Sequence, residues 1–218
     1  MTKAIVSEFL GTLLLLATVV GSGIMGETLS GGNIAVALLA NALATGAMLF
    51  VLISVFGPVS GAHFNPVVTA AMFITGRISG RSACLYVIAQ VIGALLGVLL
   101  AHQMFDQSLL QISTKIRWGD GQWVSEFTAT FGLVLLILAL LKQKPDAIPQ
   151  AVALYIVGAY WFTASTSFAN PAVTLARGFT NSFAGIAPSC IFAFVLAQCA
   201  GTVCAVVVAR VLFSESRM

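Results

Sequence analysis

Charge is scarce in this sequence. Its 218 residues include 10 Lys and Arg and 7 Asp and Glu, so charged residues make up only 8% of the chain. Soluble domains carry about a quarter of their residues as charged types. With 59% apolar residues and a mean hydropathy of +1.03, this chain could not cover a surface in water. A soluble enzyme, a disordered tail and a secreted disulfide scaffold are therefore excluded.

The sequence also lacks the patterns of several function classes. There is no basic run, so nucleic acid is not an expected partner. No nucleotide-binding motif, acidic cluster, Ser/His dyad or His/Cys ligand set is present, so we expect neither an enzyme nor a cofactor or metal. The four cysteines fall in apolar segments without metal-ligand spacing and are predicted to be small buried hydrophobes: Cys84, Cys190, Cys199 and Cys204.

Long apolar stretches are abundant. A helix that crosses a bilayer needs about 20 mostly apolar residues. Six stretches qualify, at about 4–25, 34–56, 83–101, 123–141, 148–165 and 186–212. Two more, at about 65–75 and 170–179, are too short to cross, and each begins with Asn-Pro, a good start for a helix. The prediction is an all-α membrane protein with six transmembrane helices and two re-entrant half-helices.

Cations predict the orientation, because they concentrate on the cytoplasmic side of membrane proteins. Seven fall on one side of the six-span arrangement: Lys3, Arg77, Arg81, Lys142, Lys144, Arg210 and Arg217. Three fall on the other: Lys115, Arg117 and Arg177. We therefore expect both termini in the cytoplasm of a multi-pass cell membrane protein, with the first span retained rather than cleaved as a signal peptide.

Three short patterns occur twice, in the same order. They are Glu8-Phe9 and Glu126-Phe127, Asn65-Pro-Val-Val-Thr69 and Asn170-Pro-Ala-Val-Thr174, and Ala89-Gln90-x-x-Gly93 and Ala197-Gln198-x-x-Gly201. Each copy holds three spans and one half-helix, so the second copy must lie upside down relative to the first. We expect one channel domain over 1–218, with repeat one at about 1–101, an extracellular linker at about 102–121 and repeat two at about 122–218.

Inverted repeats with broken helices place the functional site near the membrane midplane. The two half-helices would enter from opposite faces, with their N-termini pointing inward. Each N-terminus carries about +0.5 of an elementary charge. Two such ends should repel cations and offer N–H donors to neutral solutes that bear oxygen.

At these residues the chain resembles the major intrinsic protein family, the aquaporins and aquaglyceroporins. The family signature is a pair of Asn-Pro-Ala boxes, matched here by Asn65-Pro66-Val67 and Asn170-Pro171-Ala172. The flanking segment Ser60-Gly-Ala-His-Phe-Asn-Pro66 is also similar to the family's first box. The resemblance covers essentially the whole chain and implies a homotetramer in the lipid bilayer, with one pore in each subunit.

The resemblance also implies roles for individual residues. Asn65 and Asn170 would direct side-chain amide N–H groups at the permeant. Glu8 and Glu126 would hold the re-entrant loops by accepting backbone N–H bonds, with a proton relay as the alternative role. The pore carbonyl ladder would come from Gly61, Ala62, His63, Phe64, Thr166, Ser167, Phe168 and Ala169. His63 is either a hydrogen-bonded residue of the pore lining or a pH gate.

The family's outer constriction has four positions, one of them an Arg directly after the second box. By family offsets these positions are Thr45, Gly158, Ser167 and Val173, so the Arg is replaced by Val. We expect a wide, weakly polar, uncharged constriction. Arg177, two turns beyond Asn170, is either a vestibule cation or a complement to the C-terminal end of the half-helix dipole.

The function implied is passive passage of small neutral solutes: water, glycerol, urea and uncharged metalloid hydroxides such as arsenite and its methylated forms. Bacterial members that lack the constriction Arg are associated with arsenic handling, and this chain is most similar to those. The main alternative is a secondary transporter with broken helices. An intramembrane enzyme is the weakest alternative, because no catalytic set converges at one depth.

Overall fold

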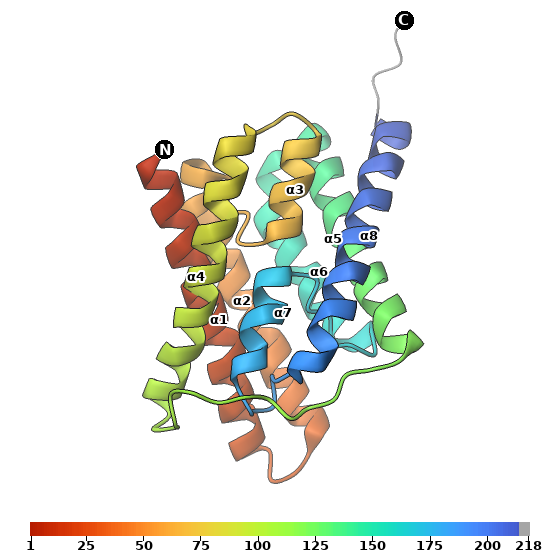
Figure 1. Ribbon diagram of the computed structural model, residues 1–218. Coiled ribbons are helices and arrows are strands. Elements are labelled where there is room, and N and C mark those ends of the chain that lie inside the picture. Colours follow the sequence, from red (N-terminus) through yellow and green to blue (C-terminus); the bar gives the residue numbers. More distant parts are fainter. Residues whose placement is uncertain (214–218) are drawn as a thin grey trace, which may run out of the picture.

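The computed structural model describes residues 1–213, and every regular element in that range is helical. Arg217, counted above among the cytoplasmic cations, lies outside the described residues. In chain order the elements are α1 (Thr2–Leu29), α2 (Ile34–Ser60), α3 (Pro66–Ile74), α4 (Gly80–Met104), α5 (Asp120–Gln143), η1 (Pro145–Ala147), α6 (Ile148–Phe162), α7 (Pro171–Ala176), η2 (Arg177–Phe179) and α8 (Pro188–Phe213) (Figure 1).

Five of the described helices are long and apolar enough to cross a membrane: α1, α2, α4, α5 and α8. The sixth predicted span, at about 148–165, is shorter than expected, because α6 has 15 residues and ends at Phe162. At Thr163 the backbone becomes extended, and the chain enters the loop before the second Asn-Pro box. A helix of 15 residues is about 22 Å long, so α6 still runs through most of the membrane's apolar layer.

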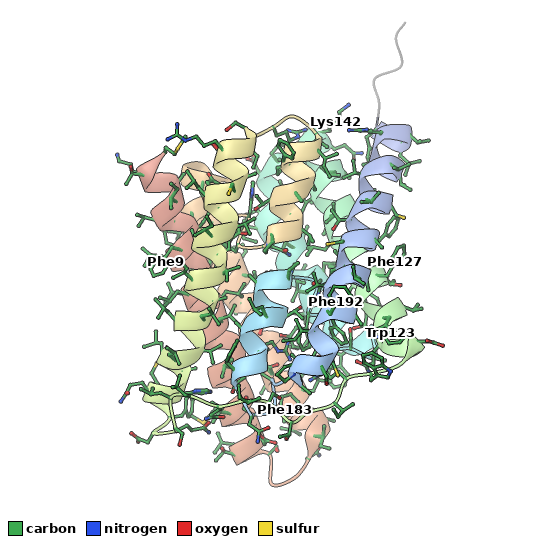
Figure 2. All side chains as sticks on the ribbon, in the orientation of Figure 1. Phe9, Trp123, Phe127, Lys142, Phe183 and Phe192 are labelled. Atoms are coloured by element: carbon green, nitrogen blue, oxygen red, sulfur yellow. The ribbon has the colours of Figure 1, made fainter. Side chains whose placement is uncertain are left out.

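Apolar and polar side chains are distributed inside out relative to a soluble protein. Large apolar residues lie on the outer surface, such as Phe192, which is 73% exposed and projects from α8 (Figure 2). Polar groups such as Glu8, Gln90, Glu126 and Gln198 are fully buried. This is the distribution expected when the surrounding solvent is lipid.

The helices form two sets of four in the same order. In the first set α1 packs against α2 and α4, and in the second set α5 packs against α6 and α8. Glycines permit the closest of these contacts. A Cβ on Gly93 would lie 2.4 Å from the carbonyl oxygen of Phe9, and one on Gly201 would lie 2.5 Å from that of Phe127. The close packing of α4 on α1 and of α8 on α5 therefore depends on a glycine at each crossing, as is common in membrane proteins.

The two half-helices start near the middle of the molecule and run to opposite ends (Figure 1). In α3 the side-chain oxygen of Asn65 accepts a hydrogen bond from the backbone N–H of Val67 at 3.0 Å. In α7 the side-chain oxygen of Asn170 accepts from the N–H groups of Ala172 at 3.0 Å and Val173 at 3.3 Å. Both predicted short helices therefore begin at their Asn-Pro boxes, with Asn as the cap.

The two ends of the molecule differ in what covers them. The N-terminus and the end of α8 lie at one end, here called the terminal end, and the segment 105–119 crosses the other, here called the linker end (Figure 1). That segment is tied to the second repeat. The N–H of Ser113 donates to the carbonyl of Gly178 at 2.9 Å, and the N–H of Ala187 donates to that of Lys115 at 2.7 Å. The predicted linker is therefore a packed cover.

The prediction that all four cysteines are buried was wrong for three of them. Cys190 is buried, whereas Cys84, Cys199 and Cys204 lie on exposed faces of α4 and α8. In a membrane protein an apolar helix face can point at lipid as well as at the protein interior. An apolar neighbourhood in the sequence therefore does not predict burial inside the protein.

Candidate pore

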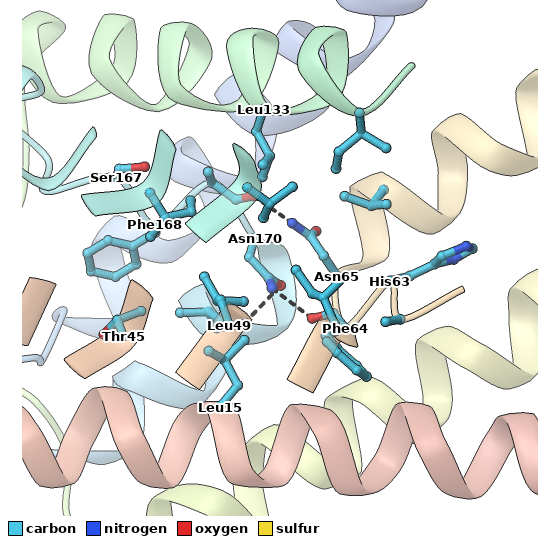
Figure 3. A pocket seen from close by; sticks show the side chains of 18 of the residues that line it. Leu15, Thr45, Leu49, His63, Phe64, Asn65, Leu133, Ser167, Phe168 and Asn170 are labelled. Carbon is cyan, nitrogen blue, oxygen red and sulfur yellow. Dashed lines mark hydrogen bonds between the residues drawn. The ribbon is translucent and has the colours of Figure 1, made fainter. Parts of the chain in front are cut away.

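A cavity of about 150 Å³ lies between the two halves and includes the point where the half-helices meet (Figure 3). Its apolar lining includes residues spaced four apart on five helices: Leu15 and Val19 on α1, Leu49 and Ile53 on α2, Val68 and Met72 on α3, Leu133, Ile137 and Leu141 on α5, and Ile148, Val152 and Ile156 on α6. Its polar lining comes mainly from the two loops that precede α3 and α7. The result is a passage with apolar side chains of helices on most sides and the polar backbone of two loops on the other.

Asn65 and Asn170 bond across the meeting point of the two repeats. The side-chain nitrogen of Asn65 donates to the carbonyl of Ala169 at 2.8 Å, and that of Asn170 donates to the carbonyl of Phe64 at 2.8 Å (Figure 3). A side-chain amide has two N–H groups. One N–H of each Asn therefore fixes the opposite loop, and the other remains for a molecule in the cavity, which both residues line.

The loops before the boxes have an unusual backbone. Ala62, Phe64, Thr166, Ser167 and Ala169 all have φ between 47° and 63°, which residues other than glycine rarely adopt. Such residues each cost about 1–3 kcal/mol and persist only when their surroundings hold them. Of the eight predicted ladder residues, Thr166 alone does not line the cavity.

Glu8 holds the first loop. One of its carboxylate oxygens accepts hydrogen bonds from the Ser60 hydroxyl at 2.7 Å and the His63 N–H at 2.9 Å. The other accepts from the Phe64 N–H at 2.7 Å and the Gln90 side chain at 2.8 Å. Four donors around one buried carboxylate compensate its lost hydration.

Glu126 holds the second loop in the same way. It accepts from the N–H groups of Phe168 and Ala169, both at 2.9 Å, and from the side chain of Gln198 at 2.6 Å. Gln198 also donates to Thr174 at 2.8 Å, as Gln90 does to Thr69 at 2.9 Å. No role was predicted for the two glutamines, although their repeated pattern marked both positions.

His63 is part of the cavity lining. Its Nδ1 lies 3.1 Å from the Thr69 hydroxyl, and its ring packs edge-on against Tyr86, with the ring centres 5.4 Å apart. These contacts fix the ring against α3 and α4.

Three of the four predicted constriction residues line the cavity: Thr45, Ser167 and Val173. The fourth, Gly158, is not among the residues that line this cavity. It lies two residues beyond Ile156, about 200° around the helix, on an exposed face where an added Cβ would meet open space. Tyr160 takes that place, with its hydroxyl 3.3 Å from that of Thr45. The i, i+4 series that ends at Tyr160 could have revealed it.

Arg177 also lines the cavity, so the lining near the linker end is neither uncharged nor free of aromatic residues. Its side chain is only 2% exposed. Its Nε donates to the carbonyl of Ala184, and its guanidinium carbon lies 3.4 Å from the centre of the Phe168 ring. Arg177 therefore adds a charged residue to the cavity lining, outside the four predicted constriction positions.

This geometry defines a class of protein: a polytopic helical membrane protein with an internal passage at the meeting point of two half-helices. Comparisons with known proteins narrow the class. The model of the family described as "Major intrinsic protein" matches residues 1–164. Aquaglyceroporin AqpS of Rhizobium meliloti (strain 1021) is 53% identical over 217 residues, which cover 100% of this chain and 93% of that protein.

One further relative and one solved structure are also similar to this chain. Aquaporin PIP2-1 of Arabidopsis thaliana is 40% identical over 163 residues, which cover 66% of this chain and 55% of that protein. The X-ray structure of the aquaglyceroporin from Plasmodium falciparum superimposes with a TM-score of 0.76 over 98% of this chain and 97% of that chain, at 20% identity. The chain belongs to the major intrinsic protein family of membrane channels. The predicted family and fold class are thereby confirmed.

Proposed function

We propose that this chain is a passive channel for water, glycerol, urea and uncharged metalloid hydroxides such as arsenite and its methylated forms. The observation that carries the proposal is the pair of asparagines that line the cavity from both repeats. Each has one N–H left after bonding the opposite loop. These donors suit hydroxyl, carbonyl and water oxygens, and the apolar helices opposite them disfavour ions.

The breadth of substrates is supported by what surrounds Val173. By the family resemblance Val173 stands at the position of an Arg, and Thr45 and Ser167 add two small hydroxyl side chains to the cavity lining. Tyr160 adds an aromatic ring whose hydroxyl lies beside that of Thr45. We therefore assign the constriction to Thr45, Tyr160, Ser167 and Val173, all of which line the cavity. Small hydroxyls opposite apolar groups fit polyols and metalloid hydroxides as well as water.

Assembly and orientation are part of the same proposal. Residues 1–218 form one channel domain with the repeat boundary in the 102–121 linker, and four copies assemble with one pore in each. Both termini face the cytoplasm of the cell membrane. The charge distribution supports this, because Arg77, Lys142 and Arg210 lie near the terminal end and Lys115 and Arg117 lie on the linker.

Stopped-flow swelling of proteoliposomes in a panel of osmolytes tests the function. We expect rates above those of empty liposomes for water, glycerol, urea and arsenite, rising in proportion to the gradient. Counterflow distinguishes the secondary transporter, because only a carrier exchanges labelled glycerol faster when unlabelled glycerol is present on the opposite side. Saturation with accelerated exchange would reject the channel.

A further inference from the structure

A buried arginine without a carboxylate partner lines the pore near the linker end. Arg177 is 2% exposed, and the only hydrogen bond of its side chain within residues 1–213 goes from Nε to the carbonyl of Ala184. Buried charges in proteins are normally paired, because removing an ion from water costs several kcal/mol. The terminal nitrogens of this guanidinium have no protein acceptor among the described residues.

A second buried arginine adds to the positive charge. Arg117 is 8% exposed and donates to the carbonyls of Gly185 at 3.0 Å and Ser165 at 3.1 Å. Its guanidinium carbon lies 5.0 Å from the centre of the Phe168 ring, which Arg177 also contacts. The carboxylate of Glu126 is already occupied by two loop N–H groups and Gln198. Within residues 1–213, two cations therefore share one aromatic ring, and neither guanidinium forms a hydrogen bond to a carboxylate. The negative charge of Glu126 acts on both from farther away.

Ser167, another residue of this cavity's lining, carries a buried hydroxyl without a partner within residues 1–213. Ser167 is 3% exposed, and its Oγ forms no hydrogen bond within the part of the chain that is described. It directly precedes Phe168, the ring against which Arg177 stacks. Buried polar side chains almost always have a partner. Ser167 and Arg177 thus both line one cavity, and each carries donor groups with no protein acceptor among the described residues.

We propose that Arg177 and Ser167 form a binding site for a small planar oxyanion of the class of nitrate and short carboxylates, and that a bound anion slows the passage of neutral solutes. The guanidinium fork matches planar oxyanions with two parallel hydrogen bonds. Arg117 strengthens the site through its charge. Beside the asparagines, the cavity is lined by Leu49 and Leu133 (Figure 3). Those side chains cannot replace hydration, so the anion is held rather than conducted.

Calorimetric titration of the detergent-solubilised protein with potassium nitrate, compared with potassium chloride, tests the binding. We expect nitrate to bind more tightly than chloride. Arg177→Lys keeps the positive charge but loses the two parallel N–H donors of the guanidinium. It should lower the affinity for nitrate about tenfold, the equivalent of ~1.4 kcal/mol. Ser167→Ala, which leaves the arginine packing intact, should cause a smaller loss. Arg81→Gln removes an exposed cation from α4 and should leave the affinity for nitrate unchanged.

The binding half of the proposal is overturned if the parent does not prefer nitrate to chloride. It is also overturned if a folded Arg177→Lys and Ser167→Ala both bind nitrate as the parent does. If Arg177→Lys does not fold, Ser167→Ala decides alone.

Glycerol flux into proteoliposomes in nitrate and in chloride tests the second half, which rests on the proposed channel function. We expect slower flux in nitrate for the parent and for Arg81→Gln, and no such difference for Ser167→Ala or Arg177→Lys. Equal glycerol flux in both salts, or a nitrate current through the parent, would overturn the claim that bound nitrate slows the passage of neutral solutes. Nitrate binding in a protein that passes no glycerol would instead reject the channel function and leave the site standing.

Discussion

The side-chain nitrogen of Asn65 lies 2.8 Å from the carbonyl oxygen of Ala169, a residue 104 positions away in the other repeat. Together with its counterpart from Asn170 to Phe64, this bond fastens the two re-entrant loops to each other. The same pair of side chains thus caps two helices, joins the repeats and presents donors to the cavity.

Asn65→Asp should partly relieve the exclusion of cations. A carboxylate at the meeting point would offset the positive ends of the two half-helix dipoles and would lose the donor to Ala169. We expect increased sodium and proton conductance in planar bilayers, and the equivalent change for Asn170→Asp. Conductances equal to those of the parent in both variants would contradict this.

Tyr160 and Gly158 provide a matched test of which face of α6 lines the pore. Tyr160→Ala should raise the flux of glycerol and larger polyols more than that of water, because it removes a ring beside Thr45. Gly158→Ala should be silent, since its Cβ meets open space. Swelling rates for water and for polyols of increasing size provide the measurement. A strong effect of Gly158→Ala with none of Tyr160→Ala would reverse the assignment.

Glu126→Gln should destabilise the protein. The side-chain amide of Gln has one acceptor oxygen, so one of the two loop N–H groups would face an NH₂ group. Losing a buried hydrogen bond to a charged group costs about 1.5–3 kcal/mol. We expect a lower unfolding temperature in detergent, whereas Glu27→Gln, an exposed control on α1, leaves it unchanged. A proton-relay role predicts the opposite outcome: normal stability with loss of proton transfer.

Nitrate binding should weaken as the pH rises through the pKa of Lys115. Burial and the charges of Arg117 and Arg177 lower this pKa to about 8, and Glu27 opposes the shift. The pKa of Arg117, lowered by burial to about 10, keeps that residue charged below this value. The Lys115 amine therefore loses its charge between about pH 7 and 9, and calorimetry should show nitrate affinity falling over that interval.

Lys115→Met provides the control, because it should bind more weakly than the parent at about pH 7 and lack most of the pH dependence. An unchanged slope in this variant would remove Lys115 from the explanation. Rising pH has the opposite effect on the stability of the fold. The unfolded chain keeps the proton up to about 10.5, so this residue adds stability as the pH rises from about 8 toward 10.5.

The fold was largely predictable because its repeated residues have local signatures. Apolar length predicted the long helices, and Asn-Pro predicted the starts of α3 and α7. The repeated Glu-Phe motif predicted the positions of Glu8 and Glu126, which the structure places against the two loops. In each case the signal lies in neighbouring residues or in the comparison of two copies.

The remaining features depend on tertiary geometry. Gly158 was chosen by counting back from the second box, which assumes a fixed path for the loop, whereas α6 ends at Phe162 and turns a different face inward. No local pattern brings Arg117, in the linker, against the same ring as Arg177. Such contacts between distant segments cannot be derived from spacing along one chain.

Ser167 is a suitable position for a thiol that reports on the proposed pore. We propose that solutes pass through the cavity that Asn65 and Asn170 line. Ser167 lines that cavity, and none of the four cysteines, all of them within residues 1–213, does so. A thiol introduced there would be accessible to a mercurial, which binds the thiolate. Cys190, in contrast, is buried, and the other three cysteines lie on outer helix faces.

Glycerol flux through Ser167→Cys proteoliposomes, measured before and after a charged mercurial and again after a reducing thiol, tests this passage most directly. We predict loss and then recovery of flux in Ser167→Cys, with the parent and a Cys190→Ser control unaffected. An active Ser167→Cys protein that is labelled by the mercurial yet conducts glycerol at its original rate would contradict the assignment of this cavity as the pore.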